Sequence, residues 1–366
     1  MAFNVDFTVC VIVMAVLTGI YVIAGGYMAT AINDFIQGII MLFGICAVIA
    51  AVLHSKGGFT EAMHALAEVK DPEATTMNGA FASFLGPDPL SLLGVVILTS
   101  LGTWGLPQMV QKFYAIKSEN AIKKGTIIST LFAIVVSGGC YFLGGFGRLF
   151  SDQVDVVANG FDSIIPTMLS GLSDVLIGLV VLLVLSASMS TLSSLVIASS
   201  STLTLDFINK NFVKDMSEKT QVRMIRVLIV VFIFISVVIA LIQYNSSVTF
   251  IAQLMGISWG ALAGSFLGPL IYGLYWKKTT KSGCWASFIF GAGIMILVIL
   301  RPQMFPAILQ SPINAGAFAM IASMILVPVV SLLTPKPSDK LVDECFRCYE
   351  TPATVASKVA LPDEEE

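Results

Sequence analysis

Charged residues are scarce in this chain of 366 residues, because aspartate, glutamate, lysine and arginine together make up only 12% of it. Hydrophobic residues make up 56%, and the mean hydropathy is +0.90. This balance excludes an ordinary water-soluble domain and is typical of a protein that crosses the membrane several times. Apolar runs of about 20 residues predict an all-α membrane protein with nine spans, near 7–27, 31–53, 90–114, 123–146, 173–203, 224–243, 248–275, 284–301 and 313–333.

Groups that catalyse reactions are scarce too. The sequence has two histidines, His54 and His64, and both lie in or beside one predicted outer loop. No pair of carboxylates lies within the predicted spans. A membrane enzyme for hydrolysis or redox chemistry needs an ionisable or metal-binding cluster, so we do not expect an enzyme.

Cysteine is present without the pattern of a disulfide framework. Four of the six cysteines, Cys10, Cys46, Cys140 and Cys284, lie in or at the edge of spans, where a thiol behaves as a small apolar group. Cys345 and Cys348 form a single CxxC, but structural zinc needs about four ligands and no second pair is near. A cleavable signal peptide with a basic region is not expected either, because residues 1–6 lead directly into the first span.

The few cations that are present orient the spans. If the amino end lies outside, sixteen of the twenty lysines and arginines fall on the inner side. The other four are Lys56, Lys70, Arg148 and Arg301. Because positive residues collect on the cytoplasmic side of membranes, we expect the amino end outside and the carboxyl end in the cytoplasm.

Two outer segments and a tail complete the predicted organisation. The segment 57–89 is expected to contain one or two short amphipathic helices near 60–69, and the acidic segment 150–173 a short re-entrant helix near 164–172. Both could serve as gates or as passive caps. Residues 1–334 are predicted to form one transmembrane domain, followed by a flexible polar tail, 335–366.

One predicted span is unusually rich in hydroxyl groups. Eleven serines and threonines occur in the nineteen residues 186–204, at the end of an apolar run. Ala187, Ser190 and Thr191 are spaced i, i+3 and i+4 and therefore share one helix face. Oxygen atoms gathered on one face at membrane depth can hold a hard cation. Small hydroxyl residues also allow close helix packing, and the spacing alone leaves both interpretations open.

The third predicted span carries the residues that break helices. Gly102, Gly105 and Pro107 fall in its middle, where glycine lowers helix stability and proline removes a backbone hydrogen bond. We expect an unwound segment between about Ser100 and Pro107. Such broken helices mark the binding sites of secondary transporters, although a proline kink without a ligand has the same sequence pattern.

Four stretches of the chain resemble the sodium:solute symporter family, which includes the proline, pantothenate and sodium/glucose cotransporters. They are Tyr21–Ala29 followed by Asp34–Gln37, Gly105–Ala115, Met189–Asp206, and Gly268–Gly283. Two positions depart from the family pattern: Tyr27 replaces the usual leucine, methionine or phenylalanine, and Lys112 stands where arginine is common. The matches extend from the first predicted span to the eighth.

The resemblance implies a partial leucine-transporter fold with inverted repeats, in which the nine spans correspond to core helices four to twelve. The first three core helices and the helix before them have no counterpart in this sequence. The resemblance assigns sodium ligands to the Ala187 carbonyl and to the Ser190 and Thr191 hydroxyls, and the other half of that family site comes from the first core helix. Asp34 is an acid near a membrane boundary, where it could cap or brace the inner end of its helix or take part in coupling.

For the solute we expect contacts from the broken helix, through Trp104, Pro107 and Gln108, and from Gln253 on the tenth core helix. An intramembrane glutamine can equally bridge two helices. The expected function is sodium-coupled symport of a small organic solute, such as an amino acid or a carboxylate. The expected partners are the solute, sodium and the lipid bilayer, with no nucleic acid and no cofactor besides the coupling ion. The alternative is a truncated or regulatory membrane fragment that does not transport.

Overall fold

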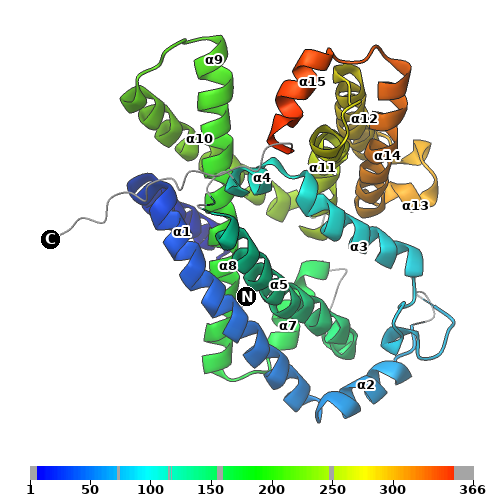
Figure 1. Ribbon diagram of the computed structural model, residues 1–366. Helices are drawn as coiled ribbons and strands as arrows, with labels where there is room; N and C mark the ends of the chain where they lie inside the picture. Colours follow the sequence, from blue (N-terminus) through cyan, green and yellow to red (C-terminus); the bar gives the residue numbers. More distant parts are fainter. Residues whose placement is uncertain are drawn as a thin grey trace. The chain divides into compact units, whose positions relative to one another are not determined.

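The computed structural model describes residues 6–71, 75–113, 116, 118–154, 160–246 and 251–349, and these residues form helices without any strand (Figure 1). The chain divides into two compact units, and the single transmembrane domain over 1–334 stays a prediction. Unit 1 comprises residues 1–84 and 127–250, and unit 2 comprises residues 85–126 and 251–366. Each unit is described by itself.

The long apolar helices confirm eight of the nine predicted spans. In the described part of the chain, eight helices are long and apolar enough to cross a membrane. Unit 1 contains α1 (Phe7–Ser55), most of α5 (Glu119–Gly145), α8 (Asp174–Ser201) and α10 (Glu218–Ser246), and unit 2 contains α11 (Ile251–Tyr275), α12 (Lys281–Leu300) and α14 (Pro312–Leu333). The count reaches eight because α1 holds two spans, Phe7–Gly26 and Met28–Ser55.

The remaining predicted span, near 90–114, is the one that was expected to be broken, and the break is confirmed. Helix α3 (Pro89–Gly102) is followed by one 3-10 turn, η2 (Thr103–Gly105), and then by α4 (Pro107–Phe113). Leu106 between them has an extended backbone, with φ −88° and ψ 118°. At the other end, Asp88 caps α3 by accepting a hydrogen bond from the Ser91 N–H at 3.1 Å, and hydrogen bonding to Ser91 lowers the pKa of this carboxyl group.

The two spans of α1 meet at Gly26. Its φ of 61° and ψ of −157° lie in a region that only glycine adopts readily. The Thr30 hydroxyl donates to the Gly26 carbonyl at 2.8 Å and satisfies a group that the break exposes. The first span packs on α8 and α10 through a cluster that includes Ala15, Val22, Val196 and Ile229. The second span packs on α5 and α8 through the cluster around Ile45, Val48 and Val52.

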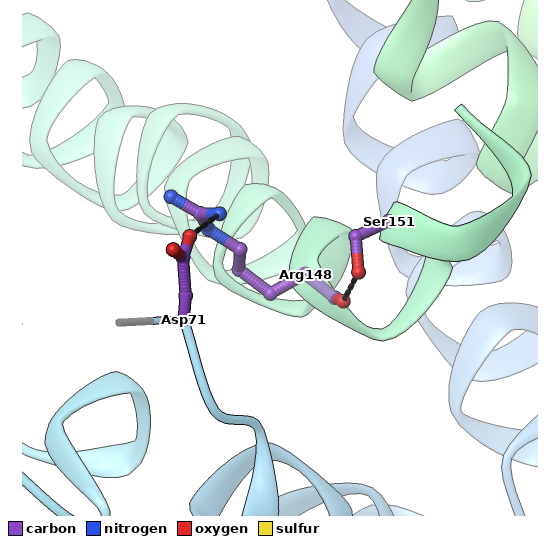
Figure 2. A network of polar contacts seen from close by, with 3 residues as sticks. All are labelled: Asp71, Arg148 and Ser151. Atoms are coloured by element: carbon purple, nitrogen blue, oxygen red, sulfur yellow. Dashed lines mark hydrogen bonds and ion pairs between the residues drawn. The ribbon is translucent and has the colours of Figure 1, made fainter. Parts of the chain in front are cut away.

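The two segments that the sequence predicts on the outer side pack against each other within unit 1. The predicted short helices are confirmed as α2 (Phe59–Glu68) and α7 (Ile164–Leu169), and between α5 and α7 lie two 3-10 segments, η3 (Phe146–Gln153) and η4 (Phe161–Ser163). Arg148 Nη1 lies 2.7 Å from Asp71 Oδ2, and the Arg148 carbonyl accepts a hydrogen bond from Ser151 (Figure 2). Lys56 Nζ donates to the Leu149 carbonyl at 3.1 Å. These contacts join the segment after α1 to the segment after α5.

Apolar packing holds these two segments together more strongly than their ion pair does. Ala62, Leu66 and Phe146 are buried together between α2 and η3. The Arg148 and Asp71 side chains are 46% and 27% exposed, and a pair this exposed contributes at most about 1 kcal/mol. The short η1 (Ala80–Ala82) also contacts α2, and Phe81 lies under the Arg148 guanidinium, 4.9 Å from its carbon to the ring centroid.

Small residues bring the helices of unit 2 close together. Gly256, Gly260, Gly264 and Gly268 recur at every fourth position of α11 and are all buried. Helices α11, α12 and α14 pack on one another in Figure 1, and the buried hydroxyls of Ser287 and Ser323 lie 2.7 Å apart between them. Membrane helices depend on such close approach and on interhelical hydrogen bonds, because lipid is as apolar as their side chains.

The remaining short elements lie between and after these spans. The last turns of α8 widen into a π-helix, Thr202–Ile208 (η5), which leads into α9 (Asn209–Asn211). Unit 2 also has η6 (Pro302–Met304) and α13 (Ala307–Gln310). Within the predicted tail, α15 (Asp339–Phe346) and η7 (Arg347–Tyr349) are helical, and the flexibility of the tail stays a prediction. Phe346 lies 5.7 Å from Lys277 Nζ, measured to its ring centroid, and residues 350–366 lie outside the described part.

Candidate functional site

The hydroxyl groups of α8 differ in what they contact. Ser193 and Ser200 are fully buried, and each donates to a carbonyl of its own helix: Ser193 to Ser190 at 2.9 Å, and Ser200 to Val196 at 2.5 Å. Such back-bonding satisfies a buried hydroxyl without a ligand. For these two residues the packing interpretation of the hydroxyl-rich stretch is sufficient.

The three predicted sodium ligands lie on another face of α8. Ala187 and Ser190 are half-buried and Thr191 is exposed. Helix α8 is described throughout, and the Ser190 and Thr191 side chains make no hydrogen bond to any described residue. These two hydroxyls are therefore without a partner among the described residues, whereas those of Ser193 and Ser200 are already bonded to their own helix.

Tyr21 of α1 contacts the same turn of α8. Its hydroxyl donates to the Met189 carbonyl at 3.1 Å, and it lies near the side chains of Ser193 and Asn33. In the sequence, Tyr21 stands out only as the first residue of a family-like stretch. Nothing in the local pattern could have found this contact, because the two residues are 168 positions apart.

Asp34 belongs to the same neighbourhood. It lies six residues into the second span of α1, which begins at Met28, and interacts electrostatically with Tyr21 of the first span. One carboxylate oxygen of Asp34 is fully buried. This position links the two spans across the Gly26 turn, and the bracing role of Asp34 stays a prediction.

The break between α3 and α4 packs against α11. A Cβ on buried Gly105 would lie 2.7 Å from the Ala263 Cα, and one on Gly102 would lie 3.0 Å from the Trp259 ring. The break therefore needs glycine at both positions to approach α11 this closely. The Thr103 hydroxyl donates to the Ser100 carbonyl at 3.1 Å and satisfies part of the backbone that the break leaves open.

The four residues predicted to contact the solute do not all lie close together in unit 2. Trp104 is 62% exposed in η2, while Pro107 begins α4 and Gln108 beside it is half-buried. Gln253 is half-buried near the start of α11. It precedes Ala263, which contacts the break, by ten positions, or about 15 Å along an α-helix. The structure brings the first three residues together and leaves Gln253 some turns away.

The chemistry available at α8 is that of neutral oxygens. Among the described residues, no group of three or more histidines, cysteines, aspartates and glutamates could hold a metal ion. A carbonyl and two hydroxyls suit a hard monovalent cation, because they bind it without fixed charge and release it again. This set lies in unit 1 and the broken helix lies in unit 2.

Comparisons with known proteins point to one family. The family model described as "Sodium:solute symporter family" matches residues 1–291. A sodium/proline symporter of Staphylococcus aureus is 28% identical over 348 residues, which cover 92% of this chain and 64% of the relative. A sodium/pantothenate symporter of Haemophilus influenzae is 27% identical over 296 residues, which cover 81% and 59%.

A solved structure shares the fold. A Na⁺-coupled sialic acid symporter in a substrate-bound, outward-open state superposes with a TM-score of 0.66 and 17% identity, over 92% of this chain and 68% of that one. The predicted leucine-transporter-like fold is thereby confirmed. The chain spans about three fifths of the length of the two curated relatives, 64% and 59%.

Proposed function

The chain belongs to the sodium:solute symporter family, and we propose that it is a sodium-coupled secondary transporter of a small organic solute. The observation that carries the proposal is the open face of α8, where Ser190 and Thr191 present hydroxyl oxygens without any bond to the described residues. Each is set in a long apolar helix that can cross a membrane. Oxygens in such a place need an occupant, because hydrocarbon offers them no water.

The coupling ion that fits this face is sodium. The Ala187 carbonyl and the two hydroxyls are hard, neutral oxygen ligands, which hold sodium weakly enough for each transport cycle to release it. Helix α8 supplies these three ligands only, so further oxygens from water, the solute or other protein segments complete the shell. Binding of sodium then biases the protein between two states that expose the solute site to opposite sides.

The solute is recognised at the break between α3 and α4. Two relatives are named for proline and pantothenate, which are both small carboxylates. The 3-10 turn η2 and the extended Leu106 interrupt the α-helix and leave backbone groups for hydrogen bonds, Trp104 offers an exposed ring, and Gln108 offers an amide. We therefore assign an amino acid or another small carboxylate to this site, with Trp104, Pro107 and Gln108 as its contacts and Gln253 in a more distant role.

Uptake into proteoliposomes tests the proposal. With the purified chain reconstituted, we expect uptake of labelled proline or pantothenate when sodium is present outside, and none when choline replaces it. Dissipating the sodium gradient with an ionophore should abolish accumulation. Absence of sodium-dependent uptake for these and other small carboxylates would contradict transport by this chain and favour a regulatory or inactive membrane protein.

The orientation of the chain is a separate prediction. The charge asymmetry places the loop between α11 and α12, with Lys277, Lys278 and Lys281, and the tail that follows α14 in the cytoplasm. In a background lacking Cys345 and Cys348, Ser338→Cys should resist a membrane-impermeant maleimide in intact cells and react after permeabilisation. Asp152→Cys, on the predicted outer side, is the matched control and should react in intact cells. Labelling of Ser338→Cys from outside would reverse the topology.

A further inference from the structure

We infer that Tyr21 is a positioning residue for the cation site on α8, an inference that rests on the proposed function. It would not touch the ion. Its hydroxyl group would hold the turn that carries Ala187, Ser190 and Thr191 in the orientation that a cation needs.

The contact itself joins two long helices at one point. The Tyr21 hydroxyl of α1 donates to the Met189 carbonyl of α8 at 3.1 Å, and Met189 lies between Ala187 and Thr191 in the sequence. Apolar packing fixes the approach, because Val22 is 1% exposed and Val196 is 3% exposed in the same cluster. The hydroxyl is thus aimed at the backbone of the ligand turn by groups that have little freedom to move.

The carbonyls of this turn are not equivalent. In an α-helix the Met189 carbonyl accepts the N–H of residue 193, and the Tyr21 hydroxyl takes its second lone pair. The Ser190 carbonyl likewise receives the Ser193 hydroxyl at 2.9 Å in addition to its helical partner. The Ala187 carbonyl receives no side-chain hydrogen bond from any described residue.

This difference decides which backbone oxygen can bind a cation. A carbonyl oxygen that accepts two hydrogen bonds has no lone pair left for an ion, whereas one that accepts a single bond still has one. Tyr21 and Ser193 therefore occupy the carbonyls of residues 189 and 190 and leave that of Ala187 open.

The substitution Tyr21→Phe tests the inference, because it removes only the hydroxyl oxygen. In Tyr21→Phe the ring remains, so the packing with Val22 and Val196 is kept while the bond to the Met189 carbonyl is lost. We expect the sodium concentration for half-maximal effect to rise about fivefold, the change expected from the loss of one hydrogen bond. The Km for the solute at saturating sodium should change less than about twofold by the same reasoning.

Two measurements separate positioning from a structural role. One is sodium-dependent uptake, and the other is the melting temperature of the purified protein as sodium replaces choline at constant ionic strength. A positioning role moves the sodium midpoint of both curves. A purely structural role lowers the melting temperature equally at every sodium concentration and leaves the midpoint in place, and that result would overturn the inference.

Tyr244→Phe is the matched control. Tyr244 lies in α10 and also contacts α1, by stacking on Phe7 with ring centroids 4.1 Å apart. Loss of its hydroxyl keeps that stacking and should leave the sodium midpoint unchanged. If both tyrosine variants shift the midpoint equally, the effect is not specific to the Met189 contact and the inference fails. If the unaltered chain responds to sodium in neither assay, the proposed function fails together with it.

Discussion

Ser190→Ala or Thr191→Ala should raise the sodium concentration needed for half-maximal uptake by about tenfold or more, which corresponds to ~1.4 kcal/mol or more of binding free energy. The reason is the small number of protein ligands on α8, where each hydroxyl supplies one oxygen. After substitution that oxygen must be replaced by water or left vacant. The solute Km at saturating sodium should change much less, because excess sodium restores the occupied state.

Ser188→Ala provides a control within the same turn. Ser188 is exposed and lies on a different face from Ser190, because successive residues of an α-helix are rotated by about 100°. Its substitution also removes one hydroxyl from α8 and should leave sodium dependence unchanged. If sodium dependence is the same in Ser190→Ala, Thr191→Ala and the unaltered protein, the hydroxyl face serves packing alone.

Local signals in the sequence were sufficient to predict most of the elements. A membrane span needs only a long apolar run, so eight spans followed from composition along the chain. The break in the third predicted span also has a local cause, because Gly102, Gly105 and Pro107 each disfavour a continuous helix at that position. The short helix α2 followed from its amphipathic pattern, and a short helix was also predicted where α7 lies.

Contacts between distant residues could not be predicted in the same way. The bond from Tyr21 to Met189 and the pair of Arg148 with Asp71 depend on which helices pack together, and no periodicity in the chain records that. The division of the predicted transmembrane domain into two units has the same origin. For the tail, low hydrophobicity suggested flexibility, yet α15 has an apolar side on which Phe346 contacts Lys277.

The candidate site was predicted in part. Spacing alone placed Ala187, Ser190 and Thr191 on one face. The structure adds that the Ser193 and Ser200 hydroxyls donate to carbonyls of their own helix. Only the structure shows this difference, because the sequence does not reveal which of the four hydroxyl groups bonds to a carbonyl of its own helix. Gln253 lies on α11, the helix that contacts the break. Its place in the sequence did not show that it lies about 15 Å along this helix from that contact.

Gly291→Ala should destabilise unit 2 by about 2 kcal/mol or more, an effect of the size that overpacking produces in a close-packed core. A Cβ at position 291 of α12 would lie 2.5 Å from the carbonyl oxygen of Gly264 and 2.5 Å from the nitrogen of Ser265. Both atoms belong to the backbone of α11, so no side chain can rotate to make room. The two helices would have to separate along this contact.

Separation would also break the polar contacts between these helices. The Ser287 hydroxyl, one turn from Gly291, lies 3.0 Å from the Ser265 carbonyl and 2.7 Å from the Ser323 hydroxyl of α14. In lipid the lost bonds have no water to replace them, so the packing defect and the hydrogen-bond defect add to each other. We expect a lower melting temperature in detergent and an earlier loss of the folded peak in size-exclusion chromatography.

Gly293→Ala is the matched control, two residues along the same helix. A Cβ at position 293 would meet nothing within 4 Å. Because alanine favours a helix over glycine by about 0.5–1 kcal/mol, this variant should be as stable as the unaltered protein or slightly more stable. Close approach of α11 and α12 through Gly264 and Gly291 then explains the difference between two identical chemical changes. Equal melting temperatures for the two variants would show that these helices can move apart without cost, and that the small-residue contact does not hold unit 2 together.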